Sequence, residues 1–134
     1  MNNKPKVIDA PLLEQLSYQA SNHERLRMNY NLHTDLENPV QRLLNALEPG
    51  TIIPIHRHLH TDEVYILLTG SIRVMLYNDE KEIIDTFLLN PIEGNHGIQI
   101  PAGQWHGIEV LEHGSVIFEV KQGPYTPLGI DDVR

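Results

Sequence analysis

After residue 24 the sequence consists of short apolar or alternating stretches, separated by turn-forming residues at close intervals. Strands that are punctuated in this way are typical of antiparallel sandwiches and barrels. We therefore predict an all-β domain. The turn signals are Asn38-Pro39, Pro49-Gly50, Thr69-Gly70, Asn78-Asp79, Asn90-Pro91, Pro101-Ala102-Gly103, His113-Gly114 and Gly123-Pro124, and the predicted strands are 25–33, 41–47, 51–56, 63–69, 71–77, 83–88, 96–100, 105–112 and 115–121.

The region before these strands has a different pattern. Leu12, Leu13, Leu16 and Ala20 recur at helical spacing, and Asp9 is placed to cap a helix that begins there. We predict one short amphipathic helix from Asp9 to about Asn22. Because 134 residues suit one domain and no linker or repeat is visible, the whole chain is predicted to form a single unit. Its parts would be a tail and helix (1–24), a barrel (about 25–125) and a C-terminal tail (126–134).

The composition narrows the class of protein and its partners. The formal net charge of −8 repels phosphate backbones, so we expect no nucleic-acid partner. The apolar runs are too short to span a bilayer, so no membrane partner is expected. The N-terminal residues lack the apolar core of a secretory signal, and there are no cysteines to form disulfides or a thiolate metal site. We expect a cytoplasmic protein.

Histidines are the unusual feature, since the chain has eight of them. His56, His58 and His60 alternate, so on a strand their side chains project to one face. Glu63 follows after a pair of residues suited to a tight bend, which can turn its carboxylate toward the same volume. Much later in the chain, His106 follows a turn and can contribute from across a barrel.

Imidazoles with one carboxylate suit divalent Fe, Mn, Zn, Ni or Co, and suit Ca or Mg poorly. A single histidine is more often a surface or core residue than a ligand. The residues alone therefore leave a metal site and a structural role evenly matched. They also leave open whether His56/His58 or His58/His60 would form the ligand pair.

The spacing of Gly50, His56, His58, Glu63 and Gly70 matches the first motif of the cupin superfamily at every fixed position. The segment from Pro101 to His106 matches the centre of the second motif, whose leading Gly and closing Asn are replaced by Asn95 and Val110. The resemblance implies a double-stranded β-helix, or jelly-roll barrel. It also implies one divalent transition metal bound by His56, His58, Glu63 and His106, with His60 outside the ligand set at the mouth of the barrel.

A polar stripe precedes the barrel motifs. Arg25, Arg27, Asn29, Asn31 and His33 alternate with apolar residues. The commoner arrangement would turn this polar face to water. The alternative places the stripe over the metal cavity, where guanidinium groups can hold a carboxylate or phosphate. The density of specific hydrogen-bonding groups favours the second reading, and we predict substrate binding by Arg25, Arg27, Asn29 and His33.

Three segments, residues 25–33, 39–46 and 118–125, are similar to the WbuC family of cupin-fold metalloproteins. The similarity runs from about residue 10 to Tyr125. Members of that family are associated with bacterial surface-polysaccharide (O-antigen) gene clusters. The resemblance thus implies sugar chemistry by association and names no reaction.

Three functions fit these observations. The first is a metal-dependent enzyme, such as an isomerase or epimerase, in which the metal acts as a Lewis acid on a small sugar-derived or anionic ligand. Its base would be one of His60, Glu119 or Tyr125. The alternatives are an Fe(II)-dependent oxygenase and a non-catalytic metal-dependent metabolite-binding module. Because barrels of this kind expose edge strands, we also expect a homodimer.

Overall fold

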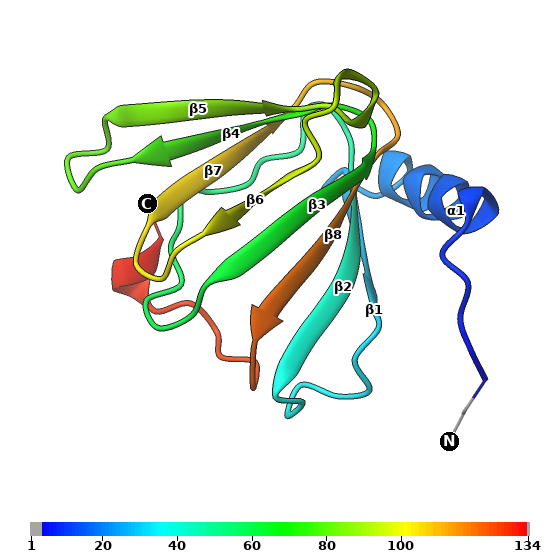
Figure 1. Cartoon of the computed structure of the whole chain (residues 1–134), viewed down its shortest axis with the longest axis horizontal. Coiled ribbons are helices and arrows are strands. Elements are labelled where there is room, and N and C mark those ends of the chain that lie inside the picture. The colour runs from blue at the N-terminus through cyan, green and yellow to red at the C-terminus, as the bar shows by residue number, and fades with distance from the viewer. Residues whose placement is uncertain (1–3, 134) are drawn as a thin grey trace.

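A computed structural model describes residues 4–133 and contains two antiparallel sheets that pack face to face (Figure 1). The larger sheet has the strand order β1-β2-β8-β3-β6 and the smaller one has the order β5-β4-β7. This architecture confirms the predicted all-β class and the one short N-terminal helix. The strands are β1 (Arg27–Asn31), β2 (Val40–Leu47), β3 (Glu63–Thr69), β4 (Ile72–Tyr77), β5 (Ile83–Leu89), β6 (Gly97–Ile100), β7 (Trp105–Val110) and β8 (Ser115–Gln122), and the helices are α1 (Ala10–Ser21) and the short 3-10 turns η1 (Pro91–Glu93) and η2 (Ile130–Asp132).

Helix α1 forms where the spacing of leucines predicted it. The Asp9 side chain accepts a hydrogen bond from the backbone N–H of Leu12 at 3.1 Å, which caps the first turn. Leu16 and Ala20 are buried against Leu44 on β2 and its neighbours on β8. The helix therefore covers part of the outer face of the larger sheet (Figure 1).

The predicted strand at 51–56 was wrong. In this segment only His56 takes part in β pairing, through isolated bridges to His106 and Val133. Pro54 has no N–H to donate to a ladder, which prevents a regular strand here. The single bridge to His106 is nevertheless complete, because each residue donates its N–H to the carbonyl oxygen of the other, at 3.0 and 2.9 Å.

The interior between the sheets changes character along the strands. On β3 the inward residues run from Glu63 to the buried Leu67, and on β7 they run from His106 to Val110. Strand β8 runs antiparallel to β3 and shows the reverse order, with Ile117 before Glu119. The polar side chains of all three strands thus gather at the same end of the barrel.

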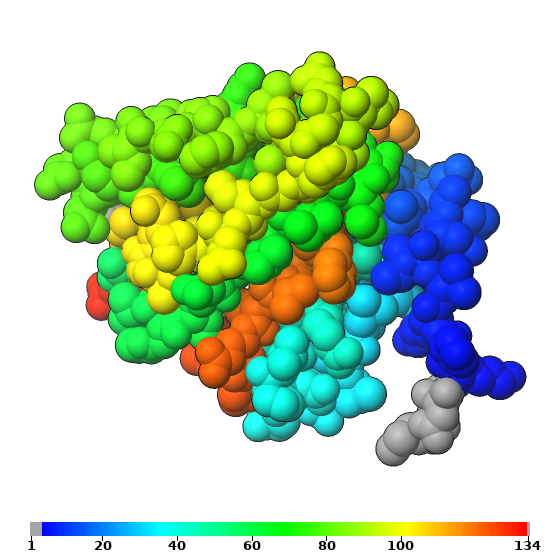
Figure 2. Space-filling model, in the orientation of Figure 1, coloured from blue at the N-terminus to red at the C-terminus, as the bar shows by residue number. Residues whose placement is uncertain are grey.

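Strand β5 forms one edge of the smaller sheet and lies at the surface (Figure 2). Ile83, Ile84 and Leu88 are more than 40% exposed along it. A second copy of the chain could cover this exposed apolar edge. The homodimer stays a prediction. Among the helices of residues 4–133, none combines the length and apolar character that crossing a membrane requires.

Candidate metal centre

Four side chains that are distant in the sequence meet at the polar end of the barrel. His56 and His58 come from the loop that precedes β3, Glu63 is the first residue of β3, and His106 is the second residue of β7. One potential ligand atom from each lies within 4.8 Å of the others. The group can therefore hold a single metal ion, and it contains the same four residues that the cupin motifs implied.

Backbone carbonyls orient two of the imidazoles. His56 Nδ1 lies 2.9 Å from the Pro54 carbonyl oxygen, and His106 Nδ1 lies 2.9 Å from that of Gln104. Because a carbonyl oxygen only accepts, each Nδ1 must carry the proton and donate. Each Nε2 is then left with its lone pair free for a metal, which is the usual arrangement behind ligating histidines.

The Glu63 carboxylate shows that the group fits a cation. Glu63 is 4% exposed, and its Oε1 has no hydrogen-bond partner. This oxygen lies 3.2 Å from His106 Nε2, while Oε2 lies 3.5 Å from His58 Nε2. A buried carboxylate without a partner is unfavourable. A divalent ion bound between Glu63 and the imidazoles would compensate its charge.

The protonation states also suit metal binding. Burial lowers the pKa of His58 to about 4, and burial together with the nearby His106 lowers the pKa of His56. Burial by itself would raise the pKa of Glu63, but the neighbouring His106 and His58 side chains outweigh it and hold that pKa below its usual range. At neutral pH the site therefore offers neutral imidazoles at His56 and His58 and an ionised carboxylate at Glu63, the forms that ligate.

A cavity of about 260 Å³ adjoins this group, and we call it the inner cavity. Most of the side chains that line it are basic, acidic, amide or imidazole groups, and few are apolar. Arg25 and Asn29 are exposed at its rim, whereas Arg27 is partly buried. Its lining is Arg25, Arg27, Asn29, Asn45, Ile53, Tyr65, Ile108, Glu119 and Lys121, with His56, His58 and Glu63.

The polar stripe is thus divided. Arg25, Arg27 and Asn29 line the inner cavity, as the binding interpretation required. His33 does not line it. His33 follows the end of β1, is 6% exposed, and contacts the backbone of Arg42 through Nδ1 at 2.9 Å. Its position indicates a structural role in joining the start of β2 to the loop before it.

The three candidate bases also occupy different places. Glu119 lines the inner cavity and accepts a hydrogen bond from Asn45 Nδ2 at 3.3 Å. Burial and the charge of Glu63 raise the pKa of Glu119 to about 7. His60 is exposed and lines a separate cavity, and Tyr125, 47% exposed, lines neither this cavity nor the inner one.

Three further residues of the inner cavity were missed from the sequence. Tyr65 is buried, and its hydroxyl lies 3.2 Å from His106 Nε2. Asn45 contacts Glu119, and Lys121 stands two residues beyond Glu119 on the same face of β8. The signal for Lys121 was available, because Glu119 and Lys121 are charged residues at alternate positions that follow the apolar Ile117 in a strand.

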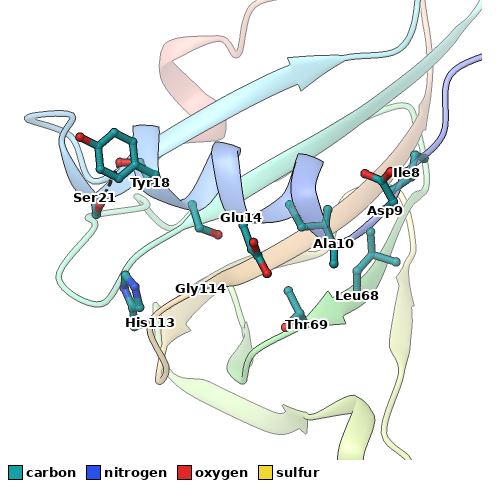
Figure 3. Close-up of a pocket in the computed structure, with 12 residues that line it drawn as sticks. Ile8, Asp9, Ala10, Glu14, Tyr18, Ser21, Leu68, Thr69, His113 and Gly114 are labelled. Atoms are coloured by element: carbon teal, nitrogen blue, oxygen red, sulfur yellow. Dashed lines mark hydrogen bonds between the residues drawn. The ribbon is translucent and has the colours of Figure 1, made fainter.

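A larger cleft lies away from this site. Its volume is about 730 Å³, and it runs between α1, the end of β3 and the turn before β8 (Figure 3). Ile8, Leu13 and Leu68 make it mainly apolar, with Glu14 and His113 at its sides. Among residues 4–133, the four-residue group in the barrel is the one cluster of potential metal ligands, so size alone does not identify the chemical site.

The sequence matches one family model. Residues 8–89 match the model of a family described as a domain of unknown function (DUF6016), and the chain belongs to this family. No curated protein matches the chain.

Solved structures with a similar fold include cupins. KdgF from Halomonas sp. is 17% identical, with a TM-score of 0.59 over 75% of this chain and 80% of that one. The Cnp3 cupin domain of Schizosaccharomyces pombe is 14% identical, with a TM-score of 0.58 over 74% and 66%. A putative sugar phosphate isomerase from Acidithiobacillus ferrooxidans is 20% identical, with a TM-score of 0.58 over 72% and 59%. These similarities establish the cupin fold, and the narrower WbuC resemblance stays a prediction.

Proposed function

We propose that this chain is a metal-dependent cupin that binds or converts a small anionic, polyhydroxylated metabolite, with the metal acting as a Lewis acid. The observation that carries the proposal is the juxtaposition of three cationic side chains with the ligand group. Arg25, Arg27 and Lys121 line the same cavity as His56, His58 and Glu63. Such a cavity favours an anion over an apolar or cationic molecule.

Arg27 supplies the most specific evidence for an anionic ligand. Its Nη1 donates to the Ile52 carbonyl oxygen at 3.2 Å, which holds the guanidinium in place. Its Nε is buried and has no hydrogen-bond partner. Burial and the neighbouring charge of Arg25 both lower the pKa of Arg27. A carboxylate or phosphate would satisfy the free donor and separate the two like charges.

The residues that line the inner cavity have different roles in this proposal. A bound metal would polarise an oxygen of the ligand. Arg25, Arg27 and Lys121 hold and orient the anionic group, and Tyr65 occupies the buried side of the cavity next to His106. Glu119, whose pKa is raised to about 7, can accept or donate a proton near neutral pH. Because Glu119 lines the same cavity as His56, His58 and Glu63, it can serve as the base of the proposed reaction.

The class of metabolite rests on supporting similarities. One structural neighbour is named a putative sugar phosphate isomerase, and a sugar phosphate combines the anionic group and the hydroxyls that this cavity would bind. The link to bacterial surface-polysaccharide biosynthesis rests on the WbuC resemblance. The same ligand group with iron would serve an oxygenase, and measuring O₂ consumption with each binding metabolite distinguishes that alternative.

The test is a thermal-shift screen of the metal-loaded protein with sugar acids and sugar phosphates. A metabolite at 100 times its Kd should add about 2.7 kcal/mol of stability. The double variant Arg25→Gln, Arg27→Gln should lose this gain and keep its metal. Arg42→Gln is the matched control, because Arg42 is exposed on the adjacent strand β2 and lies outside the cavity lining. Equal shifts in all three proteins would refute an anion-binding role for Arg25 and Arg27.

A further inference from the structure

A second cavity adjoins His58, one of the four potential metal ligands. Its volume is about 370 Å³, and we call it the outer cavity. His58 and Lys121 line both cavities, so the two meet at these side chains. The remaining wall comes from His60 and its neighbours and from the C-terminal segment, by which we mean residues 123–133.

The C-terminal segment is attached at both ends. Near its start, the Tyr125 N–H donates to the Leu36 carbonyl oxygen at 2.7 Å. Near its end, Arg57 donates twice to Asp132, from Nε to Oδ1 at 2.8 Å and from its backbone N–H to the carbonyl oxygen at 3.0 Å. Arg57 stands between His56 and His58 in the chain and also stacks on Trp105 at 4.5 Å. The segment is therefore held against the loop that carries His56 and His58.

The outer cavity has a mixed chemical surface. Lys121 and His60 provide nitrogen donors or acceptors, and Thr61, Thr126 and Gln122 provide hydroxyl and amide groups. Leu59, Leu128, Pro124 and Pro127 add aliphatic surface. This combination of polar groups and aliphatic surface matches a sugar-derived chain, which presents hydroxyls and C–H groups together.

We propose that the outer cavity is a second binding subsite, which takes the hydroxylated chain of a sugar-derived acid whose anionic end is held at the metal group and the inner cavity. Lys121, at the junction, contacts both parts of such a ligand. This inference rests on the proposed function and extends it, because it makes ligand length a determinant of affinity. The C-terminal segment then acts as a specificity wall and takes no part in holding the metal.

The test uses Co(II)-loaded full-length protein and calorimetric titration with two probes, glycolate and gluconate. Both are 2-hydroxy acids, and gluconate adds a chain of hydroxylated carbons. A few new hydrogen bonds should make gluconate bind about tenfold more tightly or better. Leu128→Trp, which fills the outer cavity, should remove that gain and leave glycolate affinity unchanged within about twofold. Ile130→Trp is the matched control, since Ile130 lies in the same segment but is 93% exposed and outside the cavity lining.

The outcomes separate this inference from the proposed function. If glycolate fails to bind, the proposed function is wrong and the subsite with it. If glycolate binds and gluconate binds no more tightly, the subsite alone is refuted. Equal weakening of both probes by Leu128→Trp also refutes it. The milder Thr126→Val removes one hydroxyl without filling the cavity, and a selective loss of gluconate affinity in this variant supports the subsite independently of packing.

Discussion

The two ends of the barrel interior are built from the same strands and have opposite properties. At one end, Leu67, Ile72 and Ile117 are at most 2% exposed and pack together in an apolar core. At the other end, Glu63 and Glu119 line the inner cavity, and His106 is buried beside Glu63. The apolar end is filled with side chains that pack against one another. The polar end contains buried polar atoms that lack hydrogen-bond partners.

This difference has an energetic meaning. Arg27 Nε, Asn45 Oδ1 and Glu63 Oε1 are buried without hydrogen-bond partners at the polar end. Each such group costs about 1–3 kcal/mol. The apolar end has to offset this cost in the free protein, and a bound metal and ligand would remove it. Stability and binding therefore depend on opposite ends of one barrel, so substitutions at the two ends should have separable effects.

The largest expected effect is on metal affinity. His106→Ala removes one of the four ligands, and the affinity should fall by more than about a hundredfold, because partners behind metal ligands alone contribute 10–100-fold. Elemental analysis and competition with a chelator would measure this. His60→Ala is the control, since His60 is the histidine that spacing left as a rival ligand and it lies outside the group. Comparable metal loss in both variants would contradict the assigned ligand set.

At the apolar end, Ile117→Ala should lower the free energy of unfolding by about 2–5 kcal/mol, because it leaves a cavity in the core. Urea denaturation of the metal-free protein would give the value. Ile92→Ala should change the stability by no more than about 0.5 kcal/mol, since Ile92 is 96% exposed. Metal stoichiometry of the folded Ile117 variant should stay unchanged, and its loss would show that the two ends are not separable.

Glu119 should make the stability of the metal-free protein depend on pH. Its pKa is raised to about 7, so between about pH 4.5 and pH 7 the folded chain keeps a proton that the unfolded chain releases. Stability therefore falls as the pH rises through this window. Glu119→Gln removes the effect and should gain about 2 kcal/mol relative to the unmodified protein between pH 4.5 and pH 8, allowing for water that reaches Glu119 through the cavity.

Thermal unfolding of the two proteins at several pH values would measure that gain. Glu80→Gln removes an exposed carboxylate and serves as the matched control. A Glu119→Gln profile that stays parallel to the unmodified protein would show that Glu119 ionises as freely in the folded chain as in the unfolded one.

The smallest expected effect is a displacement of the pH at which metal is released. With an ordinary histidine pKa near 6.5, release would begin below about pH 6. Because burial lowers the pKa of His58 to about 4 and lowers that of His56, protons compete with the metal only at lower pH. Metal should be retained down to about pH 5 in equilibrium dialysis. Half-release at pH 6 or above would contradict the buried imidazoles.

Local features were predictable from the sequence. The helix was found because capping by Asp9 and the leucine spacing act within one segment. The ligand group was found because the cupin motifs place His56, His58 and Glu63 within a few residues of each other and His106 directly after its turn. The one strand that failed, at 51–56, contains Pro54, whose missing N–H interrupts the ladder.

By itself, the sequence therefore determined the fold class and the identity of the four potential ligands, since periodicity, capping and motif spacing are properties of neighbouring residues. Only the tertiary structure decided which side chains share the cavity with them. Strand β8 pairs with β2 on one side and β3 on the other, which brings Asn45, Glu119 and Tyr65 together from three separate strands. The pairing of β1 with β2 places Arg27 at the cavity, whereas His33 lies beyond the end of β1 and outside the lining. Strand order and register depend on how the whole chain packs.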